Sequence, residues 1–243
     1  MRDTVVYNGY VLSDFFEVID VGNPMSGRVN NTKQVSGMDG VLLTGSTMNP
    51  VSIPVTFMLS EMDMSERRER LRELAYMIRS KEPTKLQFGR DHGLYYMAVP
   101  DGDFPISDHV RSEKVVVTFK AQEPMLYGAE RRVTVPSGGT VRVSIGGTYP
   151  TGLTITGDVY GDQTAGNVWG VMVDDAEFLR LELGGTSQRH VLVDCDKRYA
   201  EIDTAVTLPT MDSDWLRLDA GVHTIENDVG SGSVVVSWHE RWL

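Results

Sequence analysis

Apolar and polar side chains alternate along several segments of the first half of the chain, and this alternation predicts strands. From position 115 to 121 every second residue is apolar, while Lys114, Thr118 and Lys120 lie on the opposite face. Glu123-Pro124 ends this strand, because proline has no N–H for a strand ladder. Positions 51 to 59 alternate in the same way, and Pro54 inside them predicts an edge strand or a bulge.

Two further signals predict local structure in this half. Asn8-Gly9 lies between two apolar and aromatic runs and predicts a tight hairpin, since a type I′ turn needs positive φ at both central residues. Asp63-Met64-Ser65-Glu66 has the spacing of a capping box, with Asp63 or Ser65 as the N-cap of a helix that ends before Pro83. Segments 85–89 and 94–99 predict another pair of strands.

A polar segment from Gly22 to Gly40 separates two of the predicted strands. A connection of this length within a compact domain is usually functional or mobile. It is therefore either a mobile surface loop or a segment that docks on a neighbouring subunit. The docking interpretation places the ring or partner interface at five residues of the segment: Arg28, Val29, Asn30, Lys33 and Met38.

After Gly128 the chain consists of short predicted strands and glycine-rich turns, and the predicted strands include 140–145, 168–173, 199–202 and 222–226. Strand follows turn at intervals of about ten residues, which is typical of a sandwich. The predicted fold class is therefore mainly β, in two domains. Residues 1–128 form an N-terminal β-rich domain with one helix, and residues 129–243 form a C-terminal β-sandwich.

Composition and charge narrow the possible functions. The 243 residues carry a net charge of −11, of which −3 falls in residues 1–128 (14 basic, 17 acidic) and −8 in residues 129–243 (9 basic, 17 acidic). Such a surface repels phosphate backbones and disfavours specific nucleic-acid binding. No apolar run approaches the roughly 18 residues that span a bilayer, and the N-terminus lacks the apolar core of a signal peptide.

Motifs for catalysis or metal binding are missing from the sequence. Cys195 stands between Asp194 and Asp196, whose charges raise the pKa of a thiol, and as the single cysteine it fits a reducing compartment. There is no Gly-x-Ser-x-Gly elbow, no HExxH motif and no phosphate-binding glycine loop. A carboxylate pair for glycoside hydrolysis stays open, because 34 acidic residues always include some suitable pair. We predict a protein that is not an enzyme and has no cofactor and no metal.

The four tryptophans all fall in the second half and permit two interpretations. Their flat faces could stack on sugars, or they could pack in the core and around the chain terminus. The candidate residues are Trp169, Trp215, Trp238 and Trp242.

Several short motifs occur in a characteristic order along the chain. They are Tyr7-Asn8-Gly9, the segment 35–40, the strand leading into Pro124-Met125-Leu126-Tyr127-Gly128, Gly146-Gly147-Thr148-Tyr149-Pro150, and the ending Ser237-Trp238-His239-Glu240-Arg241-Trp242-Leu243. Through their order and spacing, the sequence resembles the distal tail protein family of siphophages, the hub proteins at the end of a long non-contractile phage tail.

This resemblance implies a structural hub. The first domain would form a homo-hexameric ring that continues the tail tube, and the second would be a galectin-like or carbohydrate-module-like jelly roll acting as an adaptor. Implied partners are other copies of the chain, the major tail tube protein, a tail-tip or tail-associated lysin protein, and in some arrangements a receptor-binding protein or a host carbohydrate. DNA would pass through the ring without specific binding, and no membrane is involved.

The resemblance also implies a location, and two other classes of function compete with it. The protein would be made in the cytoplasm of a bacterial host, from an infecting phage or a prophage, and would end at the virion tail tip. The main alternative is a carbohydrate-binding module for host-surface recognition that uses the tryptophans. The second alternative is a small cell-wall hydrolase, for which the sequence offers no site.

Overall fold

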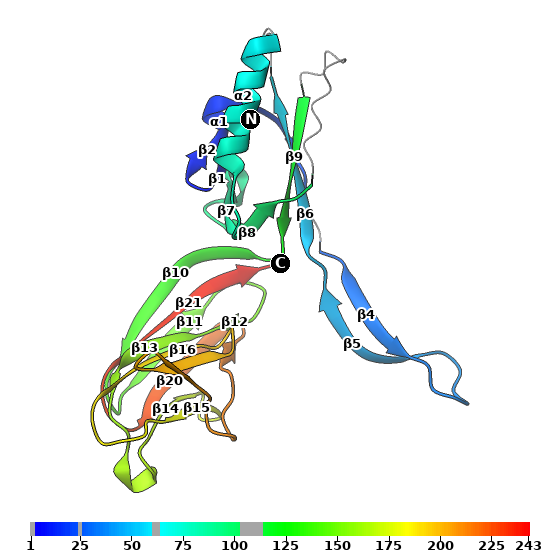
Figure 1. Ribbon diagram of the computed structural model, residues 1–243. Coiled ribbons are helices and arrows are strands. Elements are labelled where there is room, and N and C mark those ends of the chain that lie inside the picture. The colour runs from blue at the N-terminus through cyan, green and yellow to red at the C-terminus, as the bar shows by residue number, and fades with distance from the viewer. Residues whose placement is uncertain (1–2, 24–25, 60–63, 103–113) are drawn as a thin grey trace. The chain divides into compact units, whose positions relative to one another are not determined.

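A computed structural model describes residues 3–23, 26–59, 64–102 and 114–243 (Figure 1). Its internal contacts divide the chain into two compact units, Met1–Tyr127 with Leu243, and Gly128–Trp242. Each unit has a hydrophobic core of its own. Strands make up most of the regular structure in both, which confirms the prediction of a mainly β fold with a helix in the first part.

Strands of the first unit pair in the order β3-β6-β9-β8-β7-β1-β2. Their bounds are β1 Val5–Tyr7, β2 Tyr10–Val11, β3 Glu17–Val21, β6 Val51–Met58, β7 Thr84–Phe88, β8 Tyr95–Pro100 and β9 Lys114–Ala121. The predicted strands at 85–89, 94–99 and 114–121 are thereby confirmed. In β9 the side chains of Val117, Phe119 and Ala121 are buried, as the alternation requires.

The turn at Asn8-Gly9 joins β1 to β2, as predicted. Both residues have positive φ, 50° at Asn8 and 81° at Gly9, and Tyr7 pairs with Tyr10 across the turn. These are the dihedral signs of a type I′ turn, which matches the right-handed twist of the two strands.

Of the two predictions for Pro54, the edge strand is wrong, because β6 pairs with β3 on one side and β9 on the other. The β3–β6 pairing does contain a bulge, but it lies between Val18 and Asp20 of β3, opposite Phe57 and Thr56. Pairing with β3 ends at Val21 opposite Val55, and the Pro54 carbonyl then accepts a hydrogen bond from the Gly22 N–H at 2.9 Å. The N and C=O of one residue point to the same side of an antiparallel strand. The missing N–H of Pro54 therefore faces the end of β3, where the ladder stops.

Helix α2 runs from Met64 to Ile78, and a single turn, α1, runs from Leu12 to Phe15. Leu71, Leu74 and Ile78 of α2 are buried in the core of the first unit. Ser65 lies inside the helix and is not its N-cap, while the other predicted cap, Asp63, lies outside the described residues. No helix in the described ranges is long and apolar enough to cross a membrane.

The second unit is a sandwich of two sheets. One sheet has the order β11-β20-β14-β15, and the strands of the other pair in the order β18-β17-β16-β13-β21-β10. Their bounds are β10 Leu126–Val135, β11 Thr140–Ile145, β13 Thr154–Val159, β14 Val168–Val173, β15 Glu177–Glu182, β16 Arg189–Asp194, β17 Tyr199–Ile202, β18 Ala205–Thr207, β20 Gly221–Val229 and β21 Val234–Trp242. A short ladder joins β12 (Thr151–Gly152) to β19 (Arg217–Leu218). Inward side chains of both sheets form one core.

A histidine ties the turn between β14 and β15 to strand β20. His223 Nδ1 lies 2.7 Å from Asp174 Oδ2, and its Nε2 lies 2.9 Å from the Asp219 carbonyl oxygen. Asp174 also accepts a hydrogen bond from the Thr224 N–H at 2.7 Å. A neutral imidazole has one N–H, so only the imidazolium can donate to both acceptors. Burial opposes the charge, but these hydrogen bonds outweigh it and raise the pKa of His223 above 6.5.

A raised pKa in the folded state makes this contact pH-dependent. Its stabilisation is fully present below the unfolded pKa near 6.5 and is lost as the pH rises through the higher folded value. We therefore expect the wild type to melt above His223→Gln at acidic pH, with the difference shrinking as the pH rises past 6.5. Thermal denaturation of both proteins across this range provides the measurement, and a difference that is constant with pH would contradict the charged state.

Candidate interaction surface

The segment predicted to be a loop or a docking element contains half of a β-hairpin. Strand β4 (Arg28–Lys33) pairs antiparallel with β5 (Leu42–Met48), from Arg28 opposite Met48 to Lys33 opposite Leu42. Across its base, the Asn49 N–H donates to the Gly27 carbonyl at 2.9 Å and the Ser26 hydroxyl donates to the Asn49 carbonyl at 3.1 Å. Residues 28–33 of this segment therefore form a strand and not a loop (Figure 1).

A bulge shifts the register near the end of the hairpin. Asn31 pairs with Gly45 but Thr32 pairs with Leu43, so Thr44 is the extra residue, and its hydroxyl donates to the Asn31 carbonyl at 2.9 Å. After the bulge, Leu43 lies opposite Thr32 and Leu42 opposite Lys33. Since neighbouring residues on β4 point to opposite faces, the two leucines lie on opposite faces of the ribbon.

The side chains of this hairpin are exposed along its whole length. Between positions 26 and 50 every residue is exposed or half-buried, and Val41 and Leu43 are 55% and 59% exposed. The large apolar side chains that it exposes are Val29, Val35, Met38, Val41, Leu42 and Leu43. Exposed apolar groups gathered on one element are typical of an interaction site.

The backbone pairing of β4 and β5 also indicates an interaction site. In the described part of the chain β4 and β5 pair only with each other, so both strands present an open edge. A two-stranded hairpin without a core is marginally stable in water at best, and open edges are templates for pairing with another chain. The hairpin is therefore a surface that a partner would stabilise.

All five residues predicted for the interface lie on this element. Arg28, Val29, Asn30 and Lys33 are exposed on β4, and Met38 is exposed in the connection to β5. Their role in an interface stays a prediction. The exposed apolar run Val41-Leu42-Leu43 is not among the predicted interface residues, although three adjacent apolar residues after a glycine were a usable signal.

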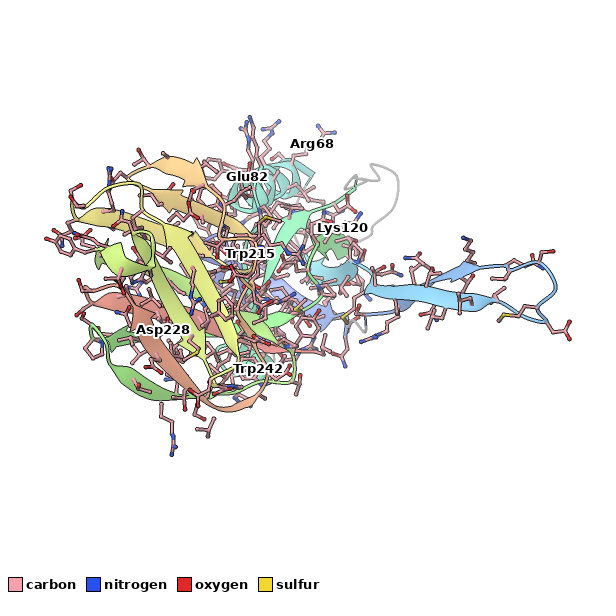
Figure 2. The ribbon with its side chains drawn as sticks, turned by 90° about the horizontal axis from the view of Figure 1, so that it is seen from below. Arg68, Glu82, Lys120, Trp215, Asp228 and Trp242 are labelled. Carbon is pink, nitrogen blue, oxygen red and sulfur yellow. The ribbon has the colours of Figure 1, made fainter. Side chains whose placement is uncertain are left out.

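The tryptophans of the second unit lie mainly in its packed interior. Trp169 is fully buried in the core, and its Nε1–H donates to Asn227 Oδ1 at 3.0 Å. Trp238 is also buried. Trp215, labelled in Figure 2 together with Trp242, is half-buried against the core. The Trp242 ring packs over Gly128, where a Cβ would lie 2.9 Å from its Cζ3. Trp169 and Trp238 therefore present no free ring face to a sugar.

Cys195 is enclosed in the core of the second unit. Burial is the main cause that raises the pKa of its thiol to about 12, with the neighbouring Asp196 and Asp194 charges adding to it. The sequence had suggested the two aspartates as the cause. No group of three or more His, Cys, Asp or Glu side chains in the described ranges is arranged to hold a metal ion.

The buried thiol is expected to be inert in the folded protein. At pH 8 the thiolate of Cys195 is scarce, so we expect Ellman's reagent to react at least about a thousandfold more slowly with the native than with the unfolded chain. Absorbance of the released thionitrobenzoate, with and without guanidinium, measures both rates. Rapid reaction of the native protein would show that the core around the thiol opens.

Two family models match the chain in succession. Residues 6–121 match the phage tail protein RIFT-related domain, and residues 146–242 match the C-terminal domain of the siphovirus-type tail component. Comparison with the curated proteins gives no match.

Solved structures with a similar fold cover the chain almost from end to end. The crystal structure of the SPP1 Dit (gp 19.1) protein, described as a paradigm of the hub adsorption apparatus in phages infecting Gram-positive hosts, matches with a TM-score of 0.75 at 19% identity and covers 100% of both chains. A chain of the phage P2 baseplate, in its activated conformation with Ca, matches with a TM-score of 0.50 at 11% identity and covers 98% of both.

Proposed function

Since the chain belongs to the siphophage distal tail protein family, we propose that it is the hub of a phage tail tip and works as a hexameric ring. The ring would join the tail tube to the tail-tip and receptor-binding apparatus and leave a channel for DNA. The observation that carries the proposal is the β4–β5 hairpin, which exposes apolar side chains and two open strand edges within the first unit.

A closed ring suits such a hairpin. In a ring, each subunit offers one surface and receives the complementary surface of its neighbour, and rotation closes the series. The hairpin is the offered surface in this proposal, with Arg28, Val29, Asn30, Lys33 and Met38 among its contacts. Burial of its apolar residues supplies the driving force, at about 25 cal/mol per Å² of apolar surface removed from water.

The charge of the chain suits a conduit for DNA. A net charge of −11 gives few sites where phosphates would be held, so a passing duplex would not be retained. Beyond other copies of itself, the protein would contact the major tail tube protein and a tail-tip or tail-associated lysin protein. It would be made in the cytoplasm of the bacterial host, from an infecting phage or a prophage, and finish in the virion tail.

Mass measurement tests the ring. Light scattering of the purified chain is expected to give about 160 kDa for six subunits of 27.0 kDa, and negative-stain images should show a six-fold particle with a central hole. The same measurement in the presence of the tail tube protein covers assembly that depends on this partner. A mass of 27.0 kDa in both samples would contradict the ring.

The carbohydrate-binding alternative based on the tryptophans gains no comparable support. Trp169 and Trp238 are buried, and stacking on a sugar needs an accessible ring face. We therefore do not propose these side chains as a sugar site.

A further inference from the structure

A groove lies between helices α1 and α2 of the first unit (Figure 1). One part of it has a volume of about 360 Å³ and is lined by residues of both helices, among them Phe15, Glu69, Arg72, Glu73, Tyr76 and Met77. A second part, of about 390 Å³, shares Glu69 and Glu73 with the first and extends toward the first turn of α2 at Glu66. Together the two parts form the α1–α2 groove.

Two aromatic side chains of the groove are exposed in the single chain. Phe15 of α1 and Tyr76 of α2 are 47% and 70% exposed, and the Tyr76 ring meets the Tyr10 ring edge-on at a centroid distance of 6.5 Å. Aromatic, methionine and arginine side chains are enriched in protein interfaces, and tyrosine is among those that contribute most to binding. Outside the hairpin, the large apolar side chains that the described part of the first unit exposes are Phe15, Ile19, Tyr76 and Val116. Half of this set therefore lines the groove.

The rim of the groove is charged, and it is acidic at one end. One stripe of α2 lines it, since four residues recur at the spacing i, i+3, i+4 and i+7: Glu69, Arg72, Glu73 and Tyr76. Arg70 Nη1 lies 2.8 Å from Glu73 Oε2 in an ion pair on this rim. Toward the start of α2, three glutamates and one arginine line the groove and give it a net charge of −2: Glu66, Glu69, Arg70 and Glu73. This end favours a cationic partner over an anionic one.

The β4–β5 hairpin carries the complementary groups. Its charged residues are Arg28, Lys33 and Asp39, two basic and one acidic, so its net charge is +1. Leu42 lies directly opposite Lys33, and Val29 is four residues before Lys33 on β4, so these three side chains share one face of the hairpin. That face combines apolar groups with a cation, as the groove combines aromatic rings with carboxylates. Both surfaces are exposed in the single chain, so the hairpin does not cover the groove of its own chain.

We propose that the α1–α2 groove receives the hairpin of a second copy of this chain. This contact depends on the proposed ring, in which each subunit presents its groove to the hairpin of its neighbour. Leu42 packs against Phe15 and Tyr76, and Lys33 lies beside it against Glu73. Side chains directly opposite on two strands have Cβ atoms about 4.5–5.5 Å apart. The three residues of helix from Glu73 to Tyr76 span about 4.5 Å, so the apolar and charged groups of the two surfaces meet in register.

Thiol cross-linking of the full-length chain tests this contact. Cys195 is buried in the folded protein, so a short bis-maleimide reaches only cysteines that are introduced on the hairpin and in the groove. We expect Leu42→Cys/Tyr76→Cys to give a ladder of linked chains on a denaturing gel, in multiples of 27.0 kDa up to the full ring. Leu43→Cys/Tyr76→Cys is the matched control, because Leu43 lies on the opposite face of the hairpin, and its chains should stay mostly unlinked.

Exchange of charges across the contact provides an independent measurement. Lys33→Glu places a carboxylate against Glu73, and since like charges then face each other, the ring of about 160 kDa is expected to fall to subunits of 27.0 kDa. Glu73→Lys in the same chain is expected to restore the ring. The matched control is Lys33→Glu/Glu82→Lys, because Glu82 is an exposed glutamate of the same unit that does not line the groove, and this variant should stay dissociated.

The outcomes separate the groove contact from the ring itself. If the wild type stays at 27.0 kDa with and without the tail tube protein, the ring is wrong and the groove contact is wrong with it. Cross-linking is carried out on samples in which light scattering shows the ring. The groove contact alone is overturned if these rings yield only unlinked chains with Leu42→Cys/Tyr76→Cys, if Lys33→Glu leaves the ring intact, or if Glu73→Lys fails to restore it.

Discussion

Aspartate in place of whichever of Leu42 and Leu43 faces the neighbouring subunit is expected to reduce the ring of about 160 kDa to subunits of 27.0 kDa. Both leucines are about half exposed in the single chain, at 49% and 59%, and the proposed ring would bury at least one of them against a neighbouring subunit. A carboxylate buried there without a partner costs several kcal/mol at each contact. Since six contacts close the ring, a loss at each one is expected to disassemble it.

The two single substitutions also identify the face of the hairpin that is covered. Leu42 and Leu43 lie on opposite faces, so a partner that covers one face is disrupted by one variant and tolerates the other. Light scattering gives the mass of each variant, and thermal denaturation gives its stability. Neither variant should lower the melting temperature of the isolated subunit by more than a few degrees, because the hairpin adds no residue to the core of the first unit.

Val206→Asp and Leu208→Asp are the matched controls. Both side chains are highly exposed apolar groups, at 71% and 79%, and they belong to the second unit. They introduce the same charge at a surface that the ring proposal does not use, and the ring mass should survive. If rings persist in both leucine variants, the hairpin is not the subunit contact. If the control variants disassemble the ring as well, the added negative charge alone explains the effect.

Strand β4 of the hairpin could not be predicted from the sequence. Polar composition and length marked residues 22–40 as unusual, but they did not show a strand, because β4 reads Arg-Val-Asn-Asn-Thr-Lys and has no alternating apolar face. Strand periodicity arises from one face being buried. In β4 every side chain is exposed, so the signal is absent for a physical reason. Only the pairing with β5 reveals it.

For strands that have one buried face, the sequence predicted the bounds more accurately. The strands at 140–145, 168–173 and 199–202 have the predicted bounds, and each contributes inward side chains to the core of the second unit. Two failures have a common cause. The strand predicted to end at Glu226 continues to Val229, and the pairing of β6 on both sides was not expected of a strand with a proline. In both cases a polar residue or a proline has a specific partner in the fold that local propensity cannot reveal.

Contacts between side chains of several strands could not be predicted from the sequence, for a similar reason. The pairing of Arg180 with Asp228 across Gly170 depends on the register of three strands and on a bulge between Gly170 and Met172. No spacing along the chain encodes it. The tryptophans suggested a sugar site by residue type, whereas the structure uses Trp169 for the core.

Alanine in place of Asn227 is expected to destabilise the second unit by about 2–5 kcal/mol. Asn227 is fully buried, and its Oδ1 accepts from Trp169 Nε1 at 3.0 Å while its Nδ2 donates to the Gly232 carbonyl at 2.7 Å. Its removal leaves the buried indole N–H and the half-buried Gly232 carbonyl without their partners, and a buried polar group without a partner costs about 1–3 kcal/mol. The melting transition of the second unit should fall by roughly 10 °C or more.

A double-mutant cycle with Trp169→Phe isolates the shared bond. Phenylalanine keeps most of the ring and removes the N–H, so in the Asn227→Ala background it removes an orphaned donor instead of creating an orphaned acceptor. The double variant is therefore expected to lose less free energy of unfolding than the two single variants together, by about 1 kcal/mol or more. Strict additivity would show that the indole finds another partner, such as water. Asn227 would then only fill space in the core and would not be the group that fixes how Trp169 is oriented.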